Sequence, residues 1–166
     1  MVQPTPAQPA LPRVGTGFDA HQIEAGKPCF IGCIEIPAAD GCEGHSDGDV
    51  VAHAIVDALL AAAGLGDLGS FVGVGRKEYD GVSGTRLLEE CVALLAQHHY
   101  RIGNVSVQLI ANTPKMAAYR EQSATRMSAI LHAPVNLSAT TTDHMGFTGR
   151  GEGRAAIATA LVFESA

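Results

Sequence analysis

The segment that most constrains the fold is the apolar run at residues 50–64, VVAHAIVDALLAAAG. Apart from His53 and Asp57, every residue before Gly64 is Ala, Val, Ile or Leu. Gly64 stands where a helix end favours a left-handed residue, so the run predicts a helix that stops there. Asp49, His53 and Asp57 are four residues apart, and a helix therefore places them on one face.

The flanking segments predict a mixture of strands and further helices. Alternating or apolar runs indicate strands at 13–20, 28–37, 104–112, 135–142 and 155–163. Helical spacing indicates helices at 85–98 and from Pro114, as a first helical residue, to about 132. Residues 41–49, 64–84 and 147–153 are expected to be turns or loops. This order predicts an α/β (α+β) two-layer sandwich, a mixed sheet with helices on one face.

Composition limits what such a domain can bind. The chain has 166 residues, with 11 Lys and Arg against 17 Asp and Glu, so its formal net charge is −6. Nucleic-acid binding needs clustered Lys and Arg, which the sequence lacks. The sequence has no apolar run of ~18 residues, so no transmembrane helix is predicted. An anionic substrate would therefore have to be handled by something other than surplus basic side chains, and bound metal ions are the obvious candidate.

The N-terminus and the cysteines predict no chemistry of their own. Residues 1–12 hold four of the eight prolines and lack the features of a signal peptide, so we expect a disordered tail, a domain at 13–166 and a cytoplasmic protein. Cys29 and Cys33 share one face of a predicted strand. With Cys42 they would be a poor zinc site, since the second ligand pair is missing. Buried free thiols, Cys91 included, are favoured.

Two short segments together predict a metal site. Asp19-Ala20-His21 follows two glycines at the end of a predicted strand, and His53 lies in the first turn of the helix at 50–64. One carboxylate and two imidazoles match the ligand count of an open zinc site. Asp57, one turn after His53, is a candidate to hold the second ring nitrogen of that histidine.

The alternative for this region is structural. Asp47 and Asp49 would then be turn and N-cap residues, and His53 would be a histidine of the core. For each residue alone the structural alternative is the stronger one. The combination of three groups, each beside a turn, favours the metal site.

Two more segments are suited to phosphate. Thr140-Thr141-Thr142-Asp143 offers hydroxyls and a carboxylate for phosphate oxygens and a hard cation such as Mg²⁺. An ordinary Thr-rich strand followed by the turn at 147–153 is the alternative. Residues 112–116 lie between a predicted strand and a predicted helix, where free N–H groups and Lys115 would attract the phosphate of a nucleotide.

Four longer runs resemble one enzyme family. They are GTGFDAH (15–21), GHSDGDVVAHAIVDALLAAAGLGDLG (44–69), GNVSVQLIANTPKM (103–116) and ATTTDHMGFTGRGEG (139–153). Over about residues 13–163 the chain resembles the 2-C-methyl-D-erythritol 2,4-cyclodiphosphate synthases. The resemblance implies a homotrimeric lyase with active sites between subunits. Such enzymes convert 4-diphosphocytidyl-2-C-methyl-D-erythritol 2-phosphate to the cyclic diphosphate and CMP, in non-mevalonate isoprenoid biosynthesis.

The resemblance also implies where metal ions bind. Asp19, His21 and His53 match the ligands of a divalent ion that is usually zinc. Asp143 stands at the acidic position, commonly Glu in the family, that contacts a second cation. That cation, Mg²⁺ or Mn²⁺, bridges the diphosphate.

Further roles follow from the same resemblance. His45 and Thr141 match the groups that stabilise the transition state. Phe147 and Arg150 match residues that line a central channel able to hold isoprenoid diphosphates. Residues 111–117 match the cytidine pocket, which serves the neighbouring subunit's site. The implied substrate contacts are Asp19, Ala20, His21, His45, Ser46, Asp67, Leu68, Gly69, Ala111, Asn112, Thr113, Pro114, Lys115, Met116, Ala117, Thr140, Thr141, Thr142, Asp143, Phe147 and Arg150.

The sequence departs from the family pattern at a few positions. Thr16 replaces a common His and Thr113 replaces a small apolar residue, and neither change affects a metal ligand. Residues 71–75, FVGVG, lack the Pro and the acidic side chain of the family's substrate-closing loop, so no contacts are inferred at 72–76. Two other functions stay open: a zinc phosphoesterase that yields a linear product, and a non-catalytic carrier of isoprenoid diphosphates.

Overall fold

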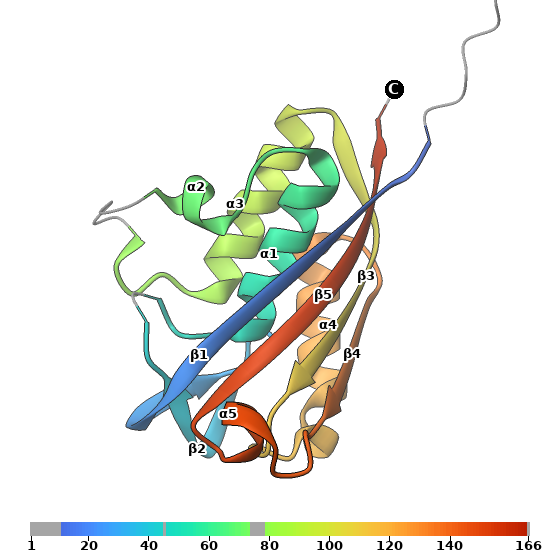
Figure 1. Cartoon of the computed structure of the whole chain (residues 1–166). Helices are drawn as coiled ribbons and strands as arrows, with labels where there is room; N and C mark the ends of the chain where they lie inside the picture. The colour runs from blue at the N-terminus through green and yellow to red at the C-terminus, as the bar shows by residue number, and fades with distance from the viewer. Residues whose placement is uncertain (1–10, 45, 74–78, 166) are drawn as a thin grey trace, which may run out of the picture.

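A five-stranded mixed sheet is the base of the fold (Figure 1). The computed structural model describes residues 11–44, 46–73 and 79–165. Spatial order in the sheet is β2-β1-β5-β3-β4; the β3–β4 pair is parallel and the other pairs are antiparallel. The strands are β1 (Arg13–Phe30), β2 (Glu35–Cys42), β3 (Tyr100–Ile110), β4 (Val135–Thr140) and β5 (Gly153–Glu164).

Three long helices cover one face of this sheet (Figure 1). They are α1 (Val50–Ala63), α3 (Gly84–Gln97) and α4 (Arg120–Leu131). Short helical turns lie in the connections: α2 (Leu68–Val72), the 3₁₀ turn η2 (Met116–Ala118) and α5 (Gly146–Gly149). The predicted two-layer sandwich with a mixed sheet is confirmed. Among the described residues, no helix has the length and apolar composition needed to cross a bilayer.

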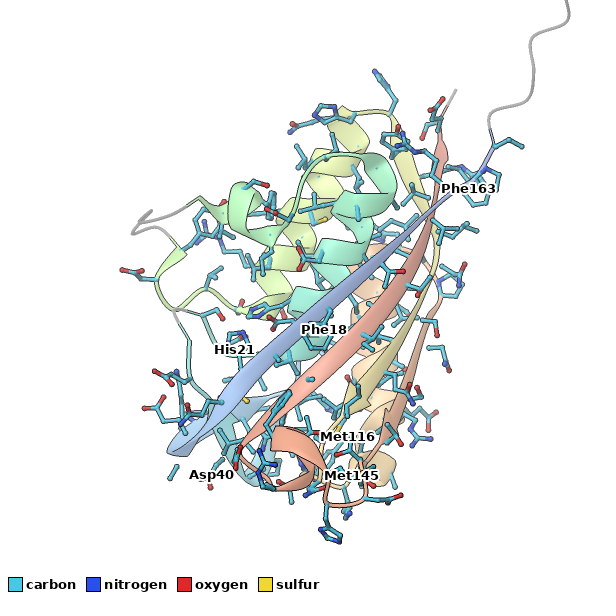
Figure 2. The ribbon with its side chains drawn as sticks, in the orientation of Figure 1. Phe18, His21, Asp40, Met116, Met145 and Phe163 are labelled. Atoms are coloured by element: carbon cyan, nitrogen blue, oxygen red, sulfur yellow. The ribbon has the colours of Figure 1, made fainter. Side chains whose placement is uncertain are left out.

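Strand alternation decides which side chains enter the core. Along β5, every second residue from Ala156 to Val162 is buried beneath the helices. On the opposite face of the sheet, Val14, Phe18 and Ile157 are between 41% and 63% exposed. Figure 2 labels Phe18. The described residues therefore bury one face of the sheet and leave an apolar strip on the other.

Two glycines let helix α1 approach the sheet unusually closely. A Cβ at Gly15 would lie 2.2 Å from the carbonyl oxygen of Ala58, and one at Gly17 would lie 2.2 Å from that of Ala54. Real Cβ atoms do not tolerate such distances from backbone, so only glycine allows this packing. Because side chains alternate along a strand, Asp19 is the next residue of β1 to face α1.

The prediction of a single strand at 28–37 is wrong. Its first residues end β1, the chain turns at 31–34, and β2 then begins. Gly32 and Cys33 both have positive φ, a conformation that interrupts a strand. The buried carboxylate of Asp49 accepts hydrogen bonds from both of their N–H groups, at 2.9 and 2.7 Å, and thereby holds the turn. Local alternation could not reveal this distant partner.

The predicted start of a helix at Pro114 is also wrong. The regular helix α4 begins six residues later, after the turn η2. The side chain of Arg154 donates a 2.7 Å hydrogen bond to the carbonyl of Thr113, so a tertiary contact holds this segment as a loop. The predicted tail falls almost wholly at residues 1–10, outside the described ranges. All four cysteines are free, and Cys33 alone is incompletely buried.

Replacing Gly17 by Ala should destabilise the protein by at least about 2 kcal/mol, because α1 would have to move away from β1. Thr16→Ala, on the exposed face of the same strand, should change stability much less. Chemical denaturation followed by circular dichroism measures both. Equal stability of the Gly17 variant and the unmodified protein would contradict the close-packing argument.

Candidate metal centre and active site

The three predicted ligands lie together where β1 passes the start of α1. Asp19 Oδ2 is 3.0 Å from both His21 Nε2 and His53 Nδ1, and those two nitrogens are 3.2 Å apart. His53 is only 3% exposed, whereas the side chains of Asp19 and His21 are 20% and 23% exposed. Three donor atoms thus converge on one point that stays open on one side, next to the labelled His21 in Figure 2.

This arrangement fits a tetrahedral metal ion. With metal–ligand bonds of about 2.0–2.1 Å, neighbouring ligands of tetrahedral zinc lie about 3.3 Å apart. The three observed separations of 3.0 to 3.2 Å are close to that spacing. Among the described residues, this is the one cluster of three or more His, Cys, Asp or Glu with suitable geometry. The structure therefore contains a possible site for a divalent ion.

The charges within the triad are coupled. Burial raises the pKa of Asp19, but hydrogen bonds from His21 and His53 outweigh it and hold that pKa well below its usual range. The hydrogen bond to Asp19 in turn raises the pKa of His21. Asp19 is therefore an anion at neutral pH and supplies the negative charge that a cation needs.

Ser46, and not Asp57, holds the second ring nitrogen of His53. Ser46 Oγ lies 3.0 Å from His53 Nε2 and accepts a hydrogen bond from the N–H of Gly48. Asp57 instead accepts a 2.6 Å hydrogen bond from the N–H of Leu68, the first residue of α2. The predicted role of Asp57 is wrong because α2 packs against that side of α1 and supplies a closer donor.

The buried carboxylate of Asp49 and the half-buried carboxylate of Asp47 fix the place where α1 begins. Asp49 is the N-cap, and its side chain accepts hydrogen bonds from the N–H groups of Val51 and Ala52. Asp47 accepts a 2.7 Å hydrogen bond from the N–H of Gly84, at the start of α3. The structural alternative is therefore correct for Asp47 and Asp49, while His53 joins the triad.

The threonine segment starts three strands away from the triad. Asp19 pairs with Ala156 on β5, Ala156 with Leu109 on β3, and Leu109 with Ala139 on β4. At about 4.8 Å per strand spacing, Asp19 and Ala139 lie about 14 Å apart. One chain therefore does not place the end of β4 directly beside the triad.

Beyond β4, the chain forms a tight polar turn. Thr141 Oγ1 donates to Asp143 Oδ1 at 3.3 Å, and both side chains are exposed. Thr142 Oγ1 donates to the carbonyl of Met145 and lies 3.0 Å from Thr148 Oγ1. Thr141 and Asp143 are thus free to face a ligand, whereas Thr142 stabilises the turn.

The loop at 111–117 borders a cavity of about 570 Å³ between this loop and β2. Thr113, Pro114 and Lys115 line one side of the cavity, and Asp40 lies on the other. Asn112 Nδ2 donates a 2.5 Å hydrogen bond to the carbonyl of Gly149, which ties the loop to α5. In Figure 2, Asp40 and Met116 lie at the end of the sheet opposite Phe163.

The remaining predicted residues lie at the edges of these features. Phe147 is 40% exposed and lines a cavity of about 410 Å³ with Ala20 and His21. Arg150 forms an exposed ion pair with Glu152, with Nε and Oε1 2.7 Å apart. The Asp67-Leu68-Gly69 segment begins α2, where Asp67 forms a capping box. His45 and residues 74–76 lie outside the described ranges.

Comparison with known proteins decides the family. Residues 12–163 match the YgbB family. The chain belongs to the YgbB family. It is 50% identical, over 151 residues and 90% of each chain, to 2-C-methyl-D-erythritol 2,4-cyclodiphosphate synthase of Cutibacterium acnes. All the motifs that suggested the resemblance lie within the matched range.

Solved structures support the same membership of the YgbB family. The Plasmodium falciparum IspF in complex with CDP superposes with a TM-score of 0.80 at 26% identity, covering 93% of this chain and 97% of that one. The CDP-bound form of another 2C-methyl-D-erythritol-2,4-cyclodiphosphate synthase gives 0.83 at 29% identity, covering 90% and 99%. The fold of this YgbB chain is therefore that of proteins solved with CDP.

Sequence reasoning missed one residue that the structure makes prominent. Arg154 is 2% exposed and occupies a helix-facing position of β5, where Ala156 and the following inward residues are apolar. An arginine that starts an alternating apolar strand was the available signal. Its partners, which lie far away in sequence, were not predictable.

Ser46→Ala should weaken zinc binding about tenfold, because the ring of His53 loses the group that orients it. Asp57→Asn should change zinc affinity much less and should affect the ordering of α2 instead. Competition with a chromophoric chelator measures both affinities. A larger loss in the Asp57 variant would contradict the assignment of Ser46.

Zinc affinity should fall as the pH is lowered from about 8 to about 6. The raised pKa of His21 means that the metal-free protein keeps a proton on this ring to a higher pH, and zinc must displace that proton. Asp19 stays ionised throughout, so it adds no loss in this range. Calorimetry in buffers of different ionisation enthalpy should detect proton release; binding without it would contradict this view.

Proposed function

We propose that this chain converts 4-diphosphocytidyl-2-C-methyl-D-erythritol 2-phosphate to 2-C-methyl-D-erythritol 2,4-cyclodiphosphate with release of CMP. It would act as a phosphorus–oxygen lyase of non-mevalonate isoprenoid biosynthesis. The observation that carries the proposal is the convergent triad of Asp19, His21 and His53 in a member of the YgbB family. Relatives that are 46% to 50% identical have the corresponding name.

The proposed reaction is limited by repulsion between two phosphate groups and by the need to align them. The 2-phosphate of the substrate is already anionic, so no protein base has to activate it. It must approach the β-phosphorus of the anionic diphosphate in the same molecule, which requires positive charge and in-line placement. Because the side chains of this protein carry a formal net charge of −6, bound cations are the suited source of that positive charge.

Separate groups of residues hold the two proposed cations. Asp19, His21 and His53 hold zinc or a similar divalent ion, and Asp143 contacts Mg²⁺ or Mn²⁺ at the diphosphate. When bound, these ions neutralise phosphate charge and polarise the bond to the leaving group. Both the lowered pKa of Asp19 and the exposure of Asp143 support this division.

Other side chains position the substrate and stabilise developing charge. His45 and Thr141 donate hydrogen bonds to the phosphoryl oxygens that gain charge in the transition state. Ser46 and the segment Asp67-Leu68-Gly69 contact the substrate. Support for Thr141 comes from its exposed hydroxyl, which is held at 3.3 Å from Asp143.

The loop at 111–117 is the proposed cytidine pocket. Its cavity of about 570 Å³ is ample for a nucleoside, and Lys115 supplies a charge for phosphate at its rim. The relatives solved with CDP have the same fold, which supports a nucleotide ligand.

We further propose a homotrimer with active sites between subunits. The exposed apolar strip of Val14, Phe18 and Ile157 supplies a face for association. The separation of about 14 Å between the triad row and the end of β4 favours a site completed by a second subunit. Phe147 and Arg150 would line a central channel able to hold an isoprenoid diphosphate. The cytoplasm stays the predicted compartment.

His53→Ala should lose the metal and nearly all turnover, since it removes one of three ligands. His98→Ala, an exposed histidine at the end of α3, should retain both. Metal analysis, CMP release and phosphorus NMR of the product are the measurements. Undiminished turnover in the His53 variant would refute the site. A linear phosphate product would identify a phosphoesterase, and an intact metal site without CMP release a non-catalytic carrier.

A further inference from the structure

Among the described residues, the buried cation Arg154 has no anionic partner. It is 2% exposed, and its guanidinium donates to the carbonyl of Thr113 at 2.7 Å and to the thiol of Cys42 at 3.3 Å. Within the described ranges, its hydrogen bonds involve no carboxylate, and no ion pair includes it. Burial raises the pKa of the Cys42 thiol, so this partner is a neutral acceptor.

Burying an uncompensated charge is costly, and stability alone does not explain it. Removing a guanidinium from water costs several kcal/mol unless good acceptors replace the solvent. The next inward residues of β5, Ala156 and Ala158, meet the helices with methyl groups. An apolar side chain at position 154 would continue that pattern at lower cost, so the arginine is expected to serve another purpose.

The contacts of Arg154 indicate that purpose. On β5 it pairs in register with His21, and its side chain spans from there to β2 and to the loop at 111–117. The loop carbonyl that it holds belongs to Thr113, which lines the cavity of about 570 Å³. Arg154 thus connects the strand beside the triad to the wall of this cavity.

A second anchor acts on the same loop. The amide of Asn112 is tied to the carbonyl of Gly149, so adjacent loop residues are held from two directions. Arginine suits such a role because its planar fork can satisfy acceptors from two elements at once, which the single ammonium of lysine does less well.

We propose that Arg154 is a positioning residue for nucleotide recognition, which fixes the loop wall at Thr113 in its binding conformation before the ligand arrives. The inference rests on the proposed function, because it takes the loop at 111–117 as the cytidine pocket. Preorganisation lowers the ordering cost of binding, so its loss raises Kd and KM without altering the reacting groups.

The test replaces Arg154 by Met, which keeps the length of the stem and removes every donor. In the zinc-loaded full-length protein, Arg154→Met should bind CDP about tenfold more weakly and raise KM by a similar factor. The maximal rate, kcat, should stay within about threefold of that of the unmodified protein. The zinc content should not change. Hydrogen exchange at 111–117 should accelerate while exchange in α1 does not.

Two further variants make the test specific. Arg154→Lys keeps the charge and should give an intermediate Kd for CDP. Arg101→Met removes an exposed arginine near Phe163, at the other end of the sheet, and should bind CDP like the unmodified protein. If Arg154→Met fails to fold, Arg154→Lys carries the test by the same measurements.

Different outcomes would overturn the positioning role of Arg154 and the proposed function. Unchanged CDP affinity and loop exchange in a folded Arg154 variant would overturn the positioning role alone. Loss of zinc and kcat together, with CDP affinity retained, would show a merely structural role and also overturn it. An unmodified protein that binds no CDP would overturn the proposed function, and this inference with it.

Discussion

The close approach of α1 to β1 is the contact on which the rest of the structure depends. Gly15 and Gly17 bring the helix backbone against the strand, where any larger side chain would collide with Ala54 and Ala58. Because β1 alternates, its next inward position is Asp19, and the first turn of α1 then presents His53 to it at 3.0 Å. A packing constraint within the core thus sets the distances within the triad.

Electrostatics follow from that placement. A single half-buried carboxylate lies between two imidazoles, so Asp19 stays ionised and the cluster is suited to a cation. Ser46 orients the buried His53 from the far side of the ring. The chain has a formal net charge of −6, and among its described residues this triad is the one cluster with the geometry of a possible metal site. Arg154, by contrast, is a buried cation whose hydrogen-bond partners within the described ranges are neutral.

Local patterns predicted the order of strands and helices and the three residues of the triad. They failed where distant groups decide the backbone. The turn at 31–34 depends on the carboxylate of Asp49, and the loop before α4 depends on Arg154. Asp57 lies one helical turn after His53, yet its carboxylate accepts a hydrogen bond from the N–H of Leu68 in α2. Spacing along a helix places residues on a shared face, but it does not determine which hydrogen-bond partner each side chain takes.

The amino-acid sequence by itself determined the two-layer architecture, the end of α1 at Gly64 and the identity of the triad that could hold a metal ion. These depend on alternation, on helical periodicity and on backbone freedom, which neighbouring residues encode. Only the tertiary structure decided which distant groups meet, such as Ser46 behind His53 and Arg154 beneath the loop at 111–117. Those partners are brought together by sheet register and helix packing, and the free energy of such contacts depends on distances between segments that no local pattern specifies.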